Sequence, residues 1–223
     1  MTGRGPASQR VTIIETGVGN TASVMAAFAR LGIAAERANG PASIRNASAV
    51  VLPGVGAFGP GLAALRGGGL DSAIIDRVRA GSPLLAICLG LQMLCASSDE
   101  SPGATGLSVL PAAVARFGLP ASLRLPHMGW NTVSGDGPIV RPGHAYFAHS
   151  FRVSTEGVEP PEGWSIATTE YGGGFIAAVE RGPVVACQFH PELSGSWGLG
   201  LLARWARTAG LEATCTIPAG EAC

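Results

Sequence analysis

The first half of the chain alternates two kinds of apolar pattern. Three short, continuous apolar runs have the length of buried strands: 11–14, 49–52 and 84–87. Three segments with apolar residues every three to four positions have the pattern of helices: 24–31, 70–79 and 89–96. Gly32 and Gly81 follow two of these helices, where a glycine commonly ends a helix. Strands that alternate with helices predict a parallel sheet covered by helices on both faces.

The second half has a different pattern. Between 109 and 189 the apolar segments are short and strand-like, and glycine- and proline-rich turns separate them. A last helix is expected over 199–208. Its core-facing residues should be Leu199, Leu202 and either Trp205 or Ala206.

One domain is expected, because no linker, internal repeat or low-complexity tract divides the chain. Its predicted boundaries are 11 and 210, with an N-terminal tail over 1–10 and a C-terminal tail over 211–223. The predicted fold class is α/β, with a central, mostly parallel sheet flanked by helices and a strand-rich second half. The segment 53–58, which follows the second strand-like run, is expected to be a loop.

Composition narrows the range of functions. Hydrophobic residues make up 47% of the 223 residues and charged residues 13%, which supports a sizeable core and argues against disorder. Fifteen basic residues, all arginine, balance fifteen acidic ones, so there is no basic field for nucleic acid. No apolar run approaches the roughly 20 residues that cross a membrane, and the N-terminus lacks an apolar signal core. Five scattered cysteines favour a reducing compartment, here the cytoplasm, and form no metal-ligand cluster.

Cys88 lies in the most distinctive segment, Ala-Ile-Cys-Leu-Gly, at a predicted strand-to-helix junction. A sharp turn at such a junction projects a nucleophile from the end of the sheet, and small residues at Ala86 and Gly90 let strand and helix approach. The N-terminus of a helix also favours the thiolate, which is the attacking form. Taken alone, the segment is equally compatible with a cysteine that only fills the core, as we expect for Cys95 and Cys187.

His190 and Glu192 follow a buried strand in the string Gln-Phe-His-Pro-Glu. A nucleophilic cysteine needs a histidine as its base, and the histidine needs an acceptor that orients it. By itself this string is only a plausible turn with a surface acid, but with Cys88 it completes a Cys–His–Glu triad. The glycines of 53–56 allow backbone amides to face an oxyanion together with the amide of Leu89, although a glycine-rich turn alone is weak evidence.

Three strings, in this order and spacing, resemble the class-I glutamine amidotransferases: Pro-Gly-Val-Gly-Ala-Phe at 53–58, Ile-Cys-Leu-Gly-Leu-Gln at 87–92 and Gln-Phe-His-Pro-Glu at 188–192. Three others resemble the glutaminase subunits of imidazole glycerol phosphate synthase: His-Met-Gly-Trp-Asn at 127–131, Tyr-Phe-Ala-His-Ser-Phe at 146–151 and Thr-Thr-Glu-Tyr-Gly-Gly at 168–173. The likeness covers about 11–210 and implies a flavodoxin-like sheet. His-Met-Gly-Trp-Asn is the most telling string, because glutamine chemistry does not require it.

The resemblance implies hydrolysis of L-glutamine to glutamate and ammonia. Cys88 would attack the side-chain amide, His190 would pass its proton to the leaving ammonia, and Glu192 would orient His190. The substrate-binding residues implied are Gly54, Val55, Gly56, Leu89, Gln92, His149 and Ser150. No metal or organic cofactor is implied.

The resemblance also implies a partner. Ammonia would pass to a separate (β/α)₈ cyclase subunit, in a heterodimer that serves histidine biosynthesis. The residues that match positions at that interface are Asn20, Trp130, Tyr146 and Leu193.

The chain departs from the family pattern at three places. Glu15-Thr16 stands where Asp-Tyr is usual, Ala86 where a glycine is usual, and Leu193 where a lysine is usual at the cyclase interface. The triad is intact, but the details of docking are open. Two other functions therefore stay under consideration: a glutaminase that serves another synthase, and a catalytically silent assembly subunit. A cysteine-peptidase-like relative would share the cysteine turn but would not explain the His-Pro-Glu string.

Overall fold

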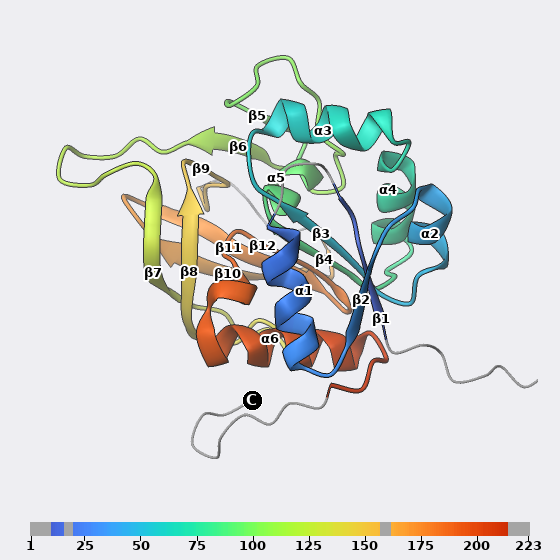
Figure 1. The fold of residues 1–223 in the computed structure, drawn as a ribbon. Coiled ribbons are helices and arrows are strands. Elements are labelled where there is room, and N and C mark those ends of the chain that lie inside the picture. Colours follow the sequence, from blue (N-terminus) through green and yellow to red (C-terminus); the bar gives the residue numbers. More distant parts are fainter. Residues whose placement is uncertain (1–9, 16–19, 157–161, 214–223) are drawn as a thin grey trace, which may run out of the picture.

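A computed structural model describes three stretches of the chain: 10–15, 20–156 and 162–213 (Figure 1). The tails expected at the two ends therefore lie almost entirely outside the described residues. No helix in the described stretches is long and apolar enough to span a membrane.

Seven strands form the central sheet, in the order β10-β11-β12-β4-β3-β1-β2. Their bounds are β1 (Arg10–Ile13), β2 (Ala34–Arg37), β3 (Val50–Gly54), β4 (Leu84–Cys88), β10 (Ser165–Glu170), β11 (Gly174–Arg181) and β12 (Val184–Cys187). The five strands from β12 to β2 are mutually parallel, whereas β11 and β10 extend the sheet with antiparallel pairing. The predicted α/β fold with a mostly parallel sheet is confirmed.

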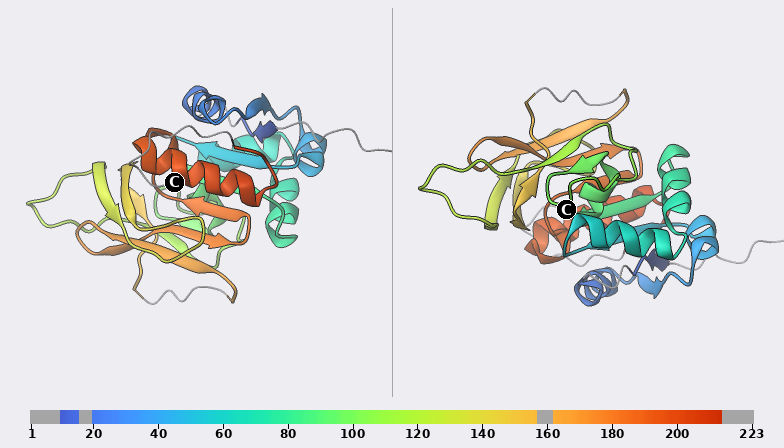
Figure 2. Two further views of the ribbon diagram at one scale, coloured as in Figure 1. Left: turned by 90° about the horizontal axis from the view of Figure 1, so that it is seen from below. Right: turned by 90° about the horizontal axis from the view of Figure 1, so that it is seen from above.

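Helices cover both faces of this sheet (Figure 2). Two pack on one face: α1 (Thr21–Arg30) and α6 (Gly195–Thr208). Four pack on the other: α2 (Pro41–Asn46), α3 (Phe58–Gly67), α4 (Asp71–Arg79) and α5 (Leu89–Leu94). In β4, Leu85 and Ile87 face the first layer, and Leu84 and Ala86 face the second. Because side chains of a strand alternate between faces, a strand covered on both sides must be apolar throughout.

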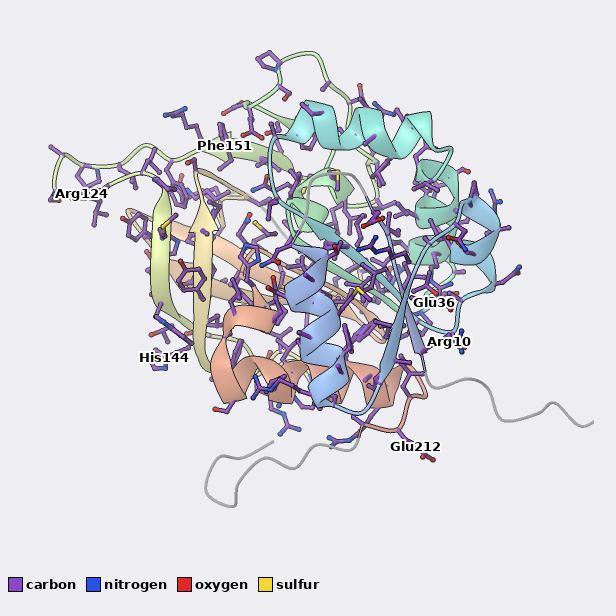
Figure 3. The ribbon with its side chains drawn as sticks, in the orientation of Figure 1. Arg10, Glu36, Arg124, His144, Phe151 and Glu212 are labelled. Carbon is purple, nitrogen blue, oxygen red and sulfur yellow. The ribbon has the colours of Figure 1, made fainter. Side chains whose placement is uncertain are left out.

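The second half adds two smaller sheets beside the central one. An antiparallel hairpin consists of β7 (His127–Val133) and β8 (Gly143–His149), and it stands next to β10 and α6 (Figure 1). The other sheet contains β5 (Ser97–Ser98), β6 (Ala113–Arg116) and β9 (Phe151–Arg152). Phe151 begins β9 only two residues after β8 ends (Figure 3). Only Ser150 therefore connects β8 to β9.

The prediction of a loop over 53–58 was wrong at both ends. Pro53 and Gly54 continue β3 and pair with β4, and Phe58 already begins α3. A proline is accepted inside this central strand because β1 pairs with β3 only as far as Val51. The missing N–H of Pro53 therefore faces no partner strand.

Helices α2 and α3 and strand β2 were not predicted from the sequence. Three glycines and a proline in α3 hide its helical pattern. One of these glycines is required by packing, since a Cβ on Gly61 would lie 2.9 Å from the sulfur of Met93. Helix α6 begins at Gly195, earlier than expected. The predicted core residues Leu199 and Leu202 are buried, and so are both alternatives for the third position, Trp205 and Ala206.

The folded domain extends past both predicted boundaries, to Arg10 at one end and at least to Ala213, which packs against the core, at the other. Arg10 begins β1 rather than ending a tail, and its guanidinium pairs with Glu36 of β2 at 2.6 Å (Figure 3). At the other end, the side chain of Leu211 is buried in the core below α6. Because its side chain is part of the core, Leu211 belongs to the folded domain.

Arg77 is the buried cation of the second helical layer. Its guanidinium donates three hydrogen bonds to backbone carbonyls, of Ile44 at 2.7 Å, Pro83 at 3.0 Å and Ser48 at 3.1 Å. Burial lowers the pKa of Arg77 from its ordinary value. The side chain thus joins α4 to the segments that lead into β3 and β4.

We expect Arg77→Ala to lower the free energy of unfolding by about 3 kcal/mol or more, because buried carbonyls lose their donors. Arg79→Ala provides a control, since Arg79 is exposed on the same helix and its loss should cost within about 0.5 kcal/mol. Urea unfolding followed by circular dichroism measures both. Equal losses in the two variants would contradict the role given to Arg77.

Candidate active site

Cys88 occupies a strained turn between β4 and α5. Its backbone has φ 54° and ψ −106°, in the left-handed region that residues other than glycine rarely adopt. The turn depends on Gly90, because a Cβ there would lie 2.2 Å from the carbonyl oxygen of Leu52. The predicted strand-to-helix turn is therefore present, and the methyl group of Ala86 is accommodated in the buried strand.

The electrostatic support for a thiolate comes mainly from His190. Helix α5 has only six residues, so its dipole is a small source of positive charge. Burial alone lowers the pKa of His190, but hydrogen bonds to Cys88 and Glu192, with the negative charge of both, raise it to about 10. The Nδ1 atom of His190 lies 2.9 Å from Oε1 of Glu192. At neutral pH the site thus holds an imidazolium between a carboxylate and the nucleophile.

Backbone contacts to β8 fix the position of His190. Its backbone N–H donates to the carbonyl oxygen of Tyr146 at 2.9 Å. The hydroxyl of Ser194 donates to the carbonyl of His190 at 2.6 Å and accepts from the backbone N–H of Tyr146 at 2.9 Å. Pro191–Leu193 forms a single 3₁₀ turn, η1, that points Glu192 back at His190. The three residues predicted as a triad are therefore brought together.

A pocket of about 280 Å³ opens beside Cys88. Six of the seven predicted substrate-binding residues line it: Val55, Gly56, Leu89, Gln92, His149 and Ser150. The seventh, Gly54, packs instead against the turn, since a Cβ there would lie 2.8 Å from the Cβ of Leu89. Gly56 has a φ of +105°, which favours glycine and gives the loop after β3 its path past the pocket.

The structure adds three residues that the sequence analysis missed. Glu100 and Arg116 line the same pocket, and Gln188 donates from Nε2 to the sulfur of Cys88 at 3.5 Å. Glu100 is fixed by the N-terminus of α3, where the backbone N–H of Phe58 donates to its Oε2 at 2.7 Å. Gln188 belongs to the string that contains His190, so its position in that string was the available signal. Nothing in the local sequence singles out Glu100 or Arg116.

His127 and His149 form a buried pair behind the pocket. His149 Nδ1 lies 2.8 Å from the carbonyl oxygen of Phe151, and His149 Nε2 lies 3.2 Å from His127 Nδ1. A carbonyl only accepts, so Nδ1 of His149 carries a proton and its Nε2 must accept from His127. The amide of Asn131 then donates to Nε2 of His127, 3.3 Å away. This chain of donors is complete only when both imidazoles are neutral.

The surroundings keep both histidines neutral. Burial lowers the pKa of His127 to about 4. Burial also lowers the pKa of His149, and although the carbonyl of Phe151 raises it, electrostatic interactions with His127, His190 and Arg152 help to bring it to about 3. In the unfolded chain both imidazoles would be protonated below their ordinary pKa of 6.5, whereas in the folded chain they stay neutral to a lower pH.

We therefore expect acid to destabilise the fold in the window from pH 6.5 down to about 4. Each histidine contributes up to roughly 1.4 kcal/mol of lost stability per pH unit, because the unfolded state binds the extra proton. His190 has the opposite sign: its stabilising effect is full below pH 6.5 and is lost as pH rises toward 10. Urea unfolding between pH 7.5 and 4.5 measures how the free energy of unfolding depends on pH. We expect this free energy to fall less steeply with decreasing pH in His127→Gln than in the unmodified chain, whereas His144→Gln, at an exposed histidine, should behave as the unmodified chain does. The same pH dependence in all three proteins would contradict this account.

One face next to the active site is apolar and exposed. Among the described residues the large exposed hydrophobic side chains are Val55, Met128, Trp130 and Leu193. Met128 and Trp130 alternate on the outer face of β7, and the ring of Trp130 lies 6.3 Å from that of Tyr146. Three of the four residues predicted for a partner interface thus lie on or beside this face. The fourth, Asn20, caps α1 by accepting from the backbone N–H of Ser23 at 3.2 Å.

Comparison with known proteins identifies the family of this chain. The profile of the class-I glutamine amidotransferase family matches residues 12–203. A crystal structure of a glutamine amidotransferase superimposes with a TM-score of 0.69 at 24% identity, and covers 89% of this chain and 98% of that one. At that identity the superposition shows the fold alone, whereas the profile shows the family. The chain belongs to the class-I glutamine amidotransferases.

More similar relatives narrow the family. The imidazole glycerol phosphate synthase subunit HisH of Symbiobacterium thermophilum is 42% identical over 204 residues, which are 89% of this chain and 93% of that protein. The HisH subunit of Rhodopirellula baltica is 42% identical over 208 residues, or 91% and 98%. The chloroplastic imidazole glycerol phosphate synthase hisHF of Arabidopsis thaliana is 40% identical over 87% of this chain but only 33% of that protein. The chain is a member of the HisH family.

Proposed function

We propose that this protein is the glutaminase subunit of an imidazole glycerol phosphate synthase, and that it hydrolyses L-glutamine at Cys88. The observation that carries the proposal is the position of Cys88 in the lining of the pocket, next to a His190 imidazole whose Nδ1 lies 2.9 Å from Glu192. Membership of the HisH family supports this synthase over the alternative of a glutaminase that serves another synthase. An intact triad gives no support to a silent assembly subunit.

The geometry supports a two-step displacement. The sulfur of Cys88 attacks the side-chain amide carbon, and a C–S bond forms while negative charge develops on the amide oxygen. His190 gives its proton to the amide nitrogen, so that the C–N bond breaks and ammonia leaves. Water then attacks the thioester with His190 as base, which releases glutamate and restores the thiol. Glu192 keeps the Nδ1 proton of His190 in place through both steps.

The loop after β3 is proposed to stabilise the oxyanion. Val55, Gly56 and Leu89 line the pocket beside Cys88, so their backbone N–H groups are the available donors. Gln92 has a narrower role than the sequence suggested, because its Nε2 already donates to the carbonyl of Phe151 and to Gln188. Only its oxygen remains to contact glutamine.

Glu100 is the proposed anchor for the α-ammonium group of glutamine. It is an acid in the lining of a pocket that must hold a zwitterion, and Arg116 in the same lining offers a charge for the α-carboxylate. The backbone N–H of Phe58 holds one oxygen of Glu100, so the carboxylate is already oriented when the substrate arrives.

We expect Glu100→Gln to raise the KM for glutamine about 10- to 100-fold with little change in kcat, since a charge-assisted hydrogen bond is lost far from the reacting amide. Asp99→Asn is the matched control: the neighbouring carboxylate accepts from the backbone N–H of Arg116 but does not line the pocket. Steady-state glutamate release measures both. An unchanged KM in Glu100→Gln would remove Glu100 from the substrate site.

The partner is proposed to be a (β/α)₈ cyclase subunit that docks on the face of Met128, Trp130 and Leu193. These side chains are exposed and apolar, and Leu193 directly follows Glu192 of the triad, which suits a surface across which ammonia passes to a partner. The hisHF relative, two thirds of which lie beyond the match, supports a second unit in the working enzyme. Leu193 would make an apolar contact there. Unpaired buried thiols at Cys95 and Cys187 support a reducing compartment, the cytoplasm.

Glutamate release tests the proposal. The purified chain is assayed alone, with the cyclase subunit from its own genome, and with that subunit and its nucleotide substrate. We expect turnover in the full mixture and little in the lone chain. Full turnover in the chain alone would contradict a partner-dependent glutaminase. Silence in every mixture, from a folded chain that binds the cyclase, would favour the assembly subunit.

A further inference from the structure

Gln188 is a fully buried amide next to the nucleophile. Its side chain is 0% exposed, and it lies between Cys88 and Gln92 at the end of β12. A primary amide removed from water at this position costs stability unless its polar atoms are paired. The nature of those pairings decides which end of the amide faces the sulfur.

The orientation follows from the carbonyl of Phe151, which can only accept. Gln92 must therefore present its Nε2 to Phe151, at 3.1 Å. The second hydrogen of the same Nε2 points to Gln188, 3.0 Å away, so Gln188 must present its Oε1 there. The Nε2 of Gln188 is then left to face Cys88, with 3.5 Å between nitrogen and sulfur. A flipped amide at either glutamine would place two donors or two acceptors against each other.

The orientation is reinforced from the other side of the pocket. The same carbonyl of Phe151 also accepts from Nδ1 of His149 at 2.8 Å, and His149 accepts in turn from His127. Both lone pairs of the carbonyl are used, so it cannot turn to another donor. Donors therefore converge on this carbonyl from His149 and from Gln92, and on the Gln92 side the network ends with an N–H of Gln188 aimed at the sulfur.

We propose that Gln188 is a catalytic residue of the glutaminase site, which donates an N–H···S hydrogen bond that stabilises the Cys88 thiolate and fixes the direction of its sulfur. The inference rests on the nucleophile proposed above. His190 supplies the opposite charge, and Gln188 supplies a second, neutral donor on a buried side of the sulfur. A donor stabilises a thiolate more than a thiol, because hydrogen bonds to charged groups are the stronger ones. Gln92 is the positioning residue that keeps the amide in this orientation.

The test is the reactivity of Cys88 in the isolated full-length chain. The rate of alkylation by iodoacetamide is followed by peptide mass spectrometry, so that Cys88 is scored separately from the other four cysteines. Gln188→Met keeps the length of the side chain but has no donor. We expect its alkylation rate at pH 7 to fall roughly 10- to 100-fold, as for loss of a hydrogen bond to a charged group. At alkaline pH, where an accessible thiol ionises without help, the rate should recover to near that of the unmodified chain.

Two more variants complete the experiment. Thr169→Val removes another buried polar group, a hydroxyl with no hydrogen-bond partner among the described residues, and should leave the rate unchanged. If Gln188→Met does not fold, Gln92→Met carries the test, and a fall in rate at pH 7 is again expected because Gln188 loses the donor that orients it. A folded variant with the unmodified rate at pH 7, or with an equal loss at all pH values, would overturn the proposal. Because no partner is present, failure of the glutaminase assay would not be mistaken for failure of this inference.

Discussion

Glutamine hydrolysis is expected to fall by at least about 10⁴-fold in Cys88→Ala, because no other group in the pocket can form the covalent intermediate. His190 and Glu192 are organised around the sulfur, and without it the imidazolium has no thiolate to stabilise. Residual activity would come only from binding and from the backbone donors. The measurement is glutamate release with the cyclase subunit and its nucleotide present.

The same position offers a matched stability experiment. Cys88 holds φ 54°, a conformation that costs alanine about 1 kcal/mol or more but glycine much less. Cys88→Gly should therefore be as inactive as Cys88→Ala yet about 1 kcal/mol more stable in urea unfolding. More than about one per cent of the activity in either variant would place the nucleophile elsewhere. Equal stabilities would show that the turn is not strained.

Gly90→Ala is expected to lower the free energy of unfolding by more than about 3 kcal/mol, or to prevent folding. The added methyl group would sit 2.2 Å from the carbonyl oxygen of Leu52 and 3.4 Å from the side chain of Ala86. Both neighbours belong to buried central strands, so neither can move away without disturbing the sheet. The turn that carries Cys88 would shift with them.

Gly67→Ala is the control for this effect. Gly67 is the last residue of α3, and a Cβ there meets no atom within 4 Å. Alanine should stabilise that helix by a few tenths of a kcal/mol, roughly in line with its helix propensity. Thermal and urea unfolding of both variants measure the difference. A Gly90→Ala protein as stable as Gly67→Ala would mean that α5 can move away from β3 without cost.

Features of the site that depend on a single strand, turn or helix start were predicted correctly from the local sequence. The strand over 84–87 and the turn at Cys88 were predicted because a short apolar run followed by a small-residue helix start has few other solutions. His190 and Glu192 are two residues apart, so their contact is a property of one turn. By contrast, α3 was missed because packing against Met93 and Leu89, not propensity, selects its glycine at 61.

The sequence by itself determined the α/β class and the strand-to-helix turn at Cys88, because each is encoded in a short run of neighbouring residues. The predicted triad and substrate-binding residues came from motifs interpreted together with the family resemblance. Only the tertiary structure decided the contacts between distant segments. Glu100 is oriented by Phe58, 42 positions earlier, and Gln188 reaches Cys88 across 100 positions. The direction of that amide depends on Gln92 and on the carbonyl of Phe151, which a buried network must satisfy together. A hydrogen-bond donor acquires its role from the acceptor that it meets, and the fold chooses the acceptor.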